Sequence, residues 1–585
     1  MLPLLLLLMP AVAQAQYFTD TNGTIWSYTD TNSQVTITGV GGMVGDVTVP
    51  SAINGDPVTS IADEAFTFSS LISITIPGSV TNIGDSALED CFLLSSVTFG
   101  NGVTSIGDQM FFKDGDLASV NIPDSVTSIG ENAFVYSGLT NIIIPGTVTN
   151  IGDAAFEDCY FLSSVTISNG VPSISYEAFD GCTSLASITI PGSVTNIGVE
   201  AFAVCYGLTA VTIRNGVPSI SADMFGGCTS LASVSIPDSV TNIGEMAFQS
   251  CPSLASIIIP DSVTSIGFEA FQFSGLTNVT IPDSVTSIGD RAFEYCSLAS
   301  ATIGNGVTSL NPEEGEDGMF EGCPNLASVT IPDSVTNMGL NTFAYCGLTS
   351  VTIPDSVTDL GDGTFYGCTS LTNVTIPSSV TSLGNSVFYG CTSLTNVNIG
   401  NGVPYLGAYA FGGCTGLASI TIPGSVTYLG NSTFVDCTSL NTIAIPSSVT
   451  SFGNSVFYDC TNLMAVYFQG NSPSPNNDTS VFSGDTNGII YYQPGTTGWG
   501  SMFDGWPTWN PQVASGGGNI GVQGNQFGFT ISGNSNLVVV VQACTNLANP
   551  VWVPISTNTL SGGTSSFSDP LWTNYPGRYY RLSSQ

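Results

Sequence analysis

The feature that most constrains this chain is an internal repeat of 22 or 23 residues that runs from about Val47 to Leu463. A clear copy is Leu231–Cys251, which reads LASVSIPDSVTNIGEMAFQSC. One anchor residue recurs in every copy, and the anchors are Phe66, Leu88, Phe111, Phe134, Phe156, Phe179, Phe202, Phe225, Phe248, Phe271, Phe293, Phe320, Phe343, Phe365, Phe388, Phe411, Phe434 and Phe457. Chance does not hold such a register over about 400 residues, so the pattern predicts one solenoid rather than several globular domains.

Each copy has three segments. The first, as in Leu326-x-x-Val329-x-Ile331, alternates apolar and polar residues at its end, which is strand periodicity. Pro or Asn-Gly then ends the strand. The second, as in Val263–Gly267, again points two apolar side chains inward and turns at glycine. The third carries the anchor residue, which we expect to fill the interior from a short helical or 3₁₀ turn.

No single copy can cover its own apolar side, so stacked copies must bury one continuous core. The spacing supports this prediction, because the step is 22 or 23 residues according to one residue gained or lost after the cysteine position. One copy of 27 residues carries extra chain at Asn311–Gly318, which we expect to bulge outward. The stack should have about 18 to 19 turns.

The pattern resembles the bacterial surface leucine-rich-repeat family typified by the BspA adhesin. The resemblance covers roughly residues 20 to 510 and rests on Leu-x-x-Val-x-Ile-Pro, Val-Thr-x-Ile-Gly-x-x-Ala-Phe and the trailing Cys. It implies a leucine-rich-repeat solenoid that is mainly β, with a parallel strand ladder and short 3₁₀ or helical turns, plus a small C-terminal β module. It also implies attachment to host or matrix proteins or to other cells.

Six parts are predicted along the chain. They are a signal peptide (1–15), an N-terminal cap (16–60), the leucine-rich repeats (61–468), a C-terminal cap (469–511), a linker (512–520) and a small β module (521–585). The signal peptide is inferred from an apolar run that ends in Ala13-Gln14-Ala15. All six Trp lie outside the repeats, and large aromatic side chains suit caps that seal the open ends of a core. The module resembles C-terminal modules of other bacterial exported proteins.

The charge of the chain limits its partners. Five basic residues stand against 43 acidic ones, for a net charge of −38. Nucleic acid and anionic membranes are therefore disfavoured, because both need clustered Lys and Arg. No segment after the N-terminus is long and apolar enough to cross a bilayer, so we expect no transmembrane segment.

Two kinds of catalytic or metal site are excluded by composition. The chain has no histidine, which removes Ser-His-Asp and Cys-His catalysis and His-ligated zinc. Fourteen of the 15 cysteines recur three residues after the anchor, from Cys91 to Cys460. Because Ser69, Asp114, Ser137 and Ser274 occupy the same position in other copies, a column of buried, reduced thiols is the favoured interpretation, and disulfides between neighbouring copies are the alternative. We expect no cofactor and no structural metal.

Acidic residues recur at one corner of the repeat, as Asp238, Asp261, Asp283, Asp333 and Asp355. Carboxylate columns can bind Ca²⁺, but Gly or Ser replaces Asp in other copies, so solvated turn residues are the favoured interpretation. The same holds for the loop residues Glu313, Glu314, Glu316 and Asp317. Paired carboxylates also hydrolyse glycosides, which leaves a polysaccharide-acting enzyme as an alternative.

Threonine recurs at the outward position of the first strand. The candidate binding face comprises Thr189, Thr212, Thr280, Thr302, Thr330, Thr352, Thr375 and Thr421. Such a row could meet a glycan, a protein ligand or an ordered lattice such as ice; the alternative is that Thr is simply a good exposed strand residue. The sequence therefore favours a secreted or surface-attached bacterial binding protein for extracellular protein or glycan ligands. The alternatives are the carboxylate enzyme and a purely structural envelope component.

Overall fold

The computed structural model describes residues 15–41, 45–310, 318–474, 480–485, 488–493, 495–513, 520–524, 526–533, 537–548 and 550–583. The expected signal peptide, apart from residue 15, and the acidic loop of Glu313 to Asp317 lie outside these residues. The chain forms two compact units, Met1–Ser334 and Val335–Gln585. Within the described residues, no helix has the length and apolar character needed to span a membrane.

The N-terminal cap is a small sheet that covers the open end of the first unit. Its strands are β1 (Gln16–Thr19), β2 (Ile25–Thr31), β3 (Gln34–Gly41), β5 (Ala52–Ile53) and β6 (Asp56–Ile61). β1, β2 and β3 pair antiparallel, and β3 then pairs parallel with β6, which starts the solenoid pattern. Trp26 is completely buried and meets the first anchor, Phe66, edge to face at 6.3 Å. This tryptophan seals the core end, as the sequence predicts.

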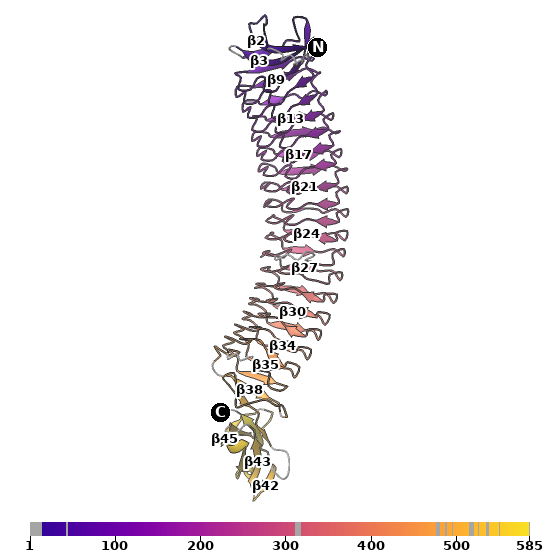
Figure 1. Ribbon diagram of the computed structural model, residues 1–585. Helices are drawn as coiled ribbons and strands as arrows, with labels where there is room; N and C mark the ends of the chain where they lie inside the picture. Colours follow the sequence, from indigo (N-terminus) through magenta and orange to yellow (C-terminus); the bar gives the residue numbers. More distant parts are fainter. Residues whose placement is uncertain are drawn as a thin grey trace, which may run out of the picture. The chain divides into compact units, whose positions relative to one another are not determined.

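Two parallel ladders run through the first unit, one from each strand segment of the repeat (Figure 1). The first ladder contains β4 (Asp46–Thr48), β7 (Ser73–Ile76), β9 (Ser96–Phe99), β11 (Ser119–Val120), β13 (Asn141–Ile144), β15 (Ser164–Ile167), β17 (Ser187–Ile190), β19 (Ala210–Ile213), β21 (Ser233–Ser235), β24 (Asn278–Thr280), β26 (Ser300–Thr302) and β27 (Ser328–Thr330). The second contains β8 (Asn82–Ile83), β10 (Ser105–Ile106), β12 (Ser128–Ile129), β14 (Asn150–Ile151), β16 (Ser173–Ile174), β18 (Asn196–Ile197), β20 (Ser219–Ile220), β22 (Asn242–Ile243), β23 (Ser265–Ile266) and β25 (Ser287–Ile288).

The second unit continues the same pattern. Its first ladder contains β28 (Ser350–Thr352), β30 (Asn373–Ile376), β32 (Asn396–Ile399), β35 (Thr442–Ile445), β37 (Ala465–Phe468), β38 (Ile489–Tyr492) and β40 (Trp506–Trp509), with β39 (Met502–Phe503) paired antiparallel to β40. Its second ladder contains β29 (Asp359–Leu360), β31 (Ser382–Leu383), β33 (Tyr405–Leu406), β34 (Tyr428–Leu429) and β36 (Ser451–Phe452). The whole is a β-solenoid of about 19 turns, which confirms the predicted fold class.

The anchors form columns in the interior of both units. Every anchor from Phe66 to Phe457 is at most 1% exposed. From Phe111 to Phe320 successive rings lie 4.9 to 5.9 Å apart, face to face. In the second unit Trp506 stacks on Phe482 at 4.3 Å and so closes the other end. Burying a Phe side chain contributes about 1.5–3 kcal/mol, so the columns are a main source of stability.

The anchor segment does not form the expected helical or 3₁₀ turn. Residues two before and two after the anchor have positive φ, as in Met246 (51°) and Ser250 (55°) around Phe248. The N–H groups of Met246, Phe248 and Ser250 all donate to carbonyls of the next coil, at 2.8 Å each. The residues between them accept from the previous coil. Each anchor segment therefore donates only toward the C-terminus and accepts only from the N-terminus.

A small β module ends the second unit. It contains β41 (Gln512–Val513), β42 (Ile520–Gln523), β43 (Gln526–Ser532), β44 (Val538–Cys544), β45 (Val553–Thr559), β46 (Thr564–Asp569) and β47 (Tyr579–Ser583), with the 3₁₀ turns η1 (Ser561–Gly563) and η2 (Trp572–Asn574). Gln512 and Val513, the first residues of the predicted linker, pair with β43; residues 514–519 lie outside the described part of the chain.

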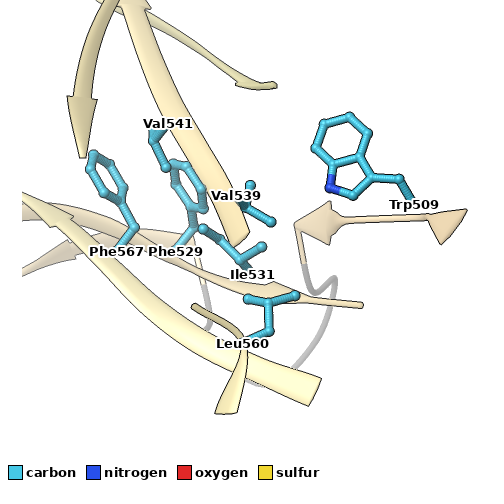
Figure 2. Close-up of a cluster of buried hydrophobic side chains, with 7 residues drawn as sticks. All are labelled: Trp509, Phe529, Ile531, Val539, Val541, Leu560 and Phe567. Atoms are coloured by element: carbon cyan, nitrogen blue, oxygen red, sulfur yellow. The ribbon is translucent and has the colours of Figure 1, made fainter. Parts of the chain in front are cut away.

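The module shares a core with the C-terminal cap. Trp509 from β40 belongs to one buried cluster with Phe529, Ile531, Val539, Val541, Leu560 and Phe567, and Ile489 and Tyr491 pack against it (Figure 2). A strand pair and a buried tryptophan thus fix the module to the last coil.

Candidate binding surface

The outward threonines of the first ladder lie side by side in register. In the first unit Thr189 pairs with Thr212, and Thr280, Thr302 and Thr330 pair in sequence. In the second unit Thr352 pairs with Thr375, and Thr421 bridges to Ala444. All of these threonines are exposed except Thr212, which is half-buried. The structure thus brings the predicted residues together within each unit.

Other side chains interrupt this threonine row. Ser235 and the highly exposed Ile258 separate Thr212 from Thr280, and Asn398 separates Thr375 from Thr421. The row is therefore uncharged but mixed, with hydroxyl, amide and aliphatic groups. Such a surface offers many weak contacts rather than one repeated contact.

A shallow hollow of about 800 Å³ lies beside the row in the first unit. We call it the Thr–Asp groove. It is lined by Thr280, Thr302 and Thr330 from the strands and by Asp261, Asp283, Asp333 and Asn305 from the corners that follow them. The three aspartates are exposed, so their carboxylates face solvent along one edge of the hydroxyl row.

The local sequence explains the groove. The outer coils end in Ile-Pro-Asp (Ile281–Asp283 and Ile331–Asp333), whereas the middle coil ends in Ile303-Gly304-Asn305. Glycine leaves empty the volume that a proline ring fills on either side. Asp283 Oδ1 accepts the N–H of Asn305 at 2.7 Å and its side-chain amide at 3.2 Å. This aspartate therefore holds the neighbouring corner as well as presenting charge.

The corner aspartates differ from the expectation of isolated, solvated turn residues. In the groove they share an edge with threonines that the sequence analysis treated separately. The signal was present in the repeat as Thr-x-Pro-Asp, because a buried Ile and a turning Pro bring the Thr and the Asp to the same edge. Among the described residues, no group of three or more Asp, Glu, Cys or His side chains has a geometry suited to a metal ion.

The cysteines form a buried hydrogen-bonded column. All 15 are unpaired and buried. Thirteen thiols donate to the carbonyl of the previous anchor at 3.0 to 3.3 Å, as from Cys391 to Phe365. Burial raises the pKa of Cys91 to about 11 and that of Cys159 to about 12. Protonated, buried thiols are poor nucleophiles, so the column is structural.

Two carboxyl groups occupy the cysteine position and behave as the thiols do. Asp114 is completely buried, and burial raises its pKa to about 9. Burial raises the pKa of Asp485 to about 7. These groups are inaccessible to a polymer substrate, so their raised pKa values indicate the donor character of the column rather than catalysis.

The anchor face carries a second set of exposed side chains that the sequence analysis missed. Aromatic residues one or two positions after successive anchors meet across coils, as Phe112, Tyr136 and Tyr160 do at 6.2 and 6.1 Å. Phe273 and Tyr295 stack at 5.1 Å. Their fixed offset from the anchor is the sequence signal that identifies this aromatic column. The stacked rings already cover one another's faces, so mainly their edges meet solvent.

Comparison with known proteins gives one family. The model of the BspA type leucine rich repeat region matches in six copies, at residues 47–163, 127–254, 200–314, 241–372, 312–416 and 382–487. No curated protein matches the chain.

Three solved structures illustrate the similarity. A leucine-rich repeat protein from Bacteroides ovatus is 24% identical over 78% of this chain and 93% of its own, with a TM-score of 0.32. A leucine rich cell surface protein from Faecalibacterium prausnitzii is 25% identical over 81% and 99%, with a TM-score of 0.28. The pneumococcal vaccine antigen PcpA is 18% identical over 81% and 98%, with a TM-score of 0.30.

Proposed function

Because this chain belongs to the family of BspA-type leucine-rich-repeat proteins, we propose that it is an exported binding and adhesion protein, secreted or held at the bacterial surface. Its ligands are extracellular proteins or glycans. The observation that carries this proposal is the row of exposed threonines held in register on the parallel ladder, with the Thr–Asp groove beside it.

The chemistry of the surface sets how it binds. Threonine side chains are short and already ordered by the strand, so contact costs little conformational entropy. Each contact is weak, and affinity comes from several coils that act together. The carboxylates of Asp261, Asp283 and Asp333 add attraction for basic groups, since the whole chain carries a net charge of −38. Binding through the groove should therefore weaken as salt is added.

The test begins with a screen of the purified full chain against glycans and matrix proteins, read by surface plasmon resonance. For each ligand found, Thr302→Ala should change the Kd by less than about twofold, because one weak contact is lost among many. The triple variant Thr280→Lys/Thr302→Lys/Thr330→Lys places three long charged side chains in the groove and should weaken binding by at least about tenfold.

A matched control carries the same three charges on the second ladder of nearby coils. Thr241, Thr264 and Thr286 are exposed there, and their change to Lys should leave the Kd nearly unaltered. Equal losses in both triple variants, or no loss in the groove variant, would contradict the proposed surface. Hydrolysis of a polysaccharide in the screen would favour the enzyme alternative, and no binding at all would favour a structural envelope component.

A further inference from the structure

The outward face of one sheet in the C-terminal module is polar and uncharged. β43 pairs with β42 on one side and with β46 on the other, both antiparallel. The register places Gly521, Gly528 and Ser568 in one row, Gln523 beside Gln526, and Thr530 beside Ser566. The alternate residues Phe529 and Phe567 point the other way into the core cluster (Figure 2).

This face is hollowed. The paired glycines Gly521 and Gly528 leave a trough of about 410 Å³, bordered by the side chains of Gln523, Gln526, Thr530, Ser566 and Ser568. The volume lies within the range of small-molecule sites, about 300–1,000 Å³. A Cβ atom on Gly528 would lie 2.6 Å from the Phe567 carbonyl oxygen, so the floor of the trough stays free of side chains. We call this hollow the module trough.

The charge of the module sets it apart from the rest of the chain. Residues 521–585 contain one acidic residue, Asp569, and two basic residues, Arg578 and Arg581, in a chain whose net charge is −38. Asp569 and Arg578 form a buried ion pair at 2.9 Å, and Arg581 donates to Gln542 on the other sheet. Every side chain that borders the trough is neutral.

We propose that the module trough binds a segment of a neutral polysaccharide. Glutamine amides and Ser or Thr hydroxyls both donate and accept hydrogen bonds, as the hydroxyl groups of a sugar do. An anionic polymer would find no cation in the trough and would be repelled by the acidic solenoid. A basic peptide would find no carboxylate there and would favour the Thr–Asp groove instead. The trough thus gives the chain a second ligand class, independent of the proposed solenoid surface.

The shared core determines how this proposal can be tested. Deleting the module would expose Trp509 and its neighbours and disturb the C-terminal cap, so loss of binding in a truncated chain would be ambiguous. Exposed point substitutions avoid this problem. Gln526→Glu/Ser568→Glu adds two charges to the trough, whereas Thr557→Glu/Thr559→Glu adds the same charges to exposed positions on β45 of the other sheet.

The assay is affinity electrophoresis of the full chain through gels that contain soluble β-glucan, glucomannan, xyloglucan or starch, with alginate as the anionic comparison. At least one neutral polymer should retard the wild-type chain, and alginate should not. The trough variant should lose at least about tenfold in apparent affinity, the β45 variant should keep it, and both should melt at the wild-type temperature. The threonine-to-lysine groove variant should also keep it, which separates this site from the solenoid surface.

The proposal is overturned if none of the neutral polymers retards the wild-type chain, if both glutamate variants are equally retarded, or if only the groove variant loses retardation. Should the trough variant prove unstable, Gln523→Ala/Gln526→Ala removes the two amides without adding charge and must weaken retardation for the proposal to stand.

Discussion

Replacing Asp114 by Asn should stabilise the N-terminal coils at neutral and alkaline pH. Asp114 Oδ1 accepts the N–H of Cys91 at 2.8 Å, while Oδ2 is buried without a hydrogen-bond partner. Burial, with added repulsion from Asp90 and Glu89, raises the pKa of Asp114 to about 9, whereas an unfolded aspartate titrates near about 3.9. Between these values the folded chain holds a proton that the unfolded chain releases.

The sign and size of the effect follow from this difference. Because the folded state binds the extra proton, the free energy of unfolding falls as pH rises, by about 1.4 kcal/mol per pH unit between about pH 4 and pH 9. From pH 5 to pH 8 the loss is roughly 4 kcal/mol. Asparagine has nearly the same shape and does not ionise, so the variant should avoid this loss.

Amide hydrogen exchange measured by mass spectrometry tests the prediction in the full chain. For peptides that cover residues 85–120, the ratio of the wild-type to the variant exchange rate should be near one at pH 4. It should rise by up to about tenfold per pH unit toward pH 8. Asp116 is exposed two residues away, and Asp116→Asn should give a ratio that does not change with pH. A pH-independent ratio for Asp114→Asn would refute the reasoning.

Three further predictions concern the interior columns. Phe271→Ala should destabilise its coils by about 3–5 kcal/mol, measured by hydrogen exchange of neighbouring peptides, while Phe273→Ala, on a half-exposed ring, should cost far less; equal costs would contradict the anchor role. Val204→Gly should stabilise by up to about 1 kcal/mol, because Val204 has φ of 54° where Gly181 and Gly227 stand in adjacent coils; a lower melting temperature would argue against backbone strain there. Thiol titration without reductant should find about 15 thiols after denaturation and almost none before it; a large shortfall after denaturation would indicate disulfides.

The solenoid and its core could be predicted because each coil repeats the same physical requirement. Anchors, strand valines and isoleucines, and trailing cysteines hold one register, and burial of that register leaves one solution. Trp26 and Trp506 were recognised as cap residues because the core must end somewhere. The outward threonines followed from strand alternation alone.

The remaining features depend on contacts between distant parts of a coil or on backbone angles. Left-handed residues around the anchor carry Met, Glu, Phe and Ser as well as Gly, so residue type did not reveal them, and a helical turn appeared to be the simpler solution. The Thr–Asp groove depends on the absence of a ring at Gly304, which matters only beside Pro282 and Pro332. The docking of the module depends on Trp509, which a reading of the glycine-rich segment as a linker could not anticipate.

The one-way hydrogen bonding of the anchor segments gives each unit an electrical direction. Peptide groups whose N–H bonds all point toward the C-terminus add their dipoles, as in a helix, with partial positive charge at the end where N–H groups have no further coil to meet. In the second unit that end is reached at Phe482, whose N–H donates to the Asp504 carboxylate at 3.3 Å. The carboxylate plays the part of an N-cap for a stack of coils rather than for a helix. Coils can therefore be gained or lost in the middle of a unit without changing the charge at its ends, whereas loss of the terminal aspartate leaves the positive end of the whole column unpaired.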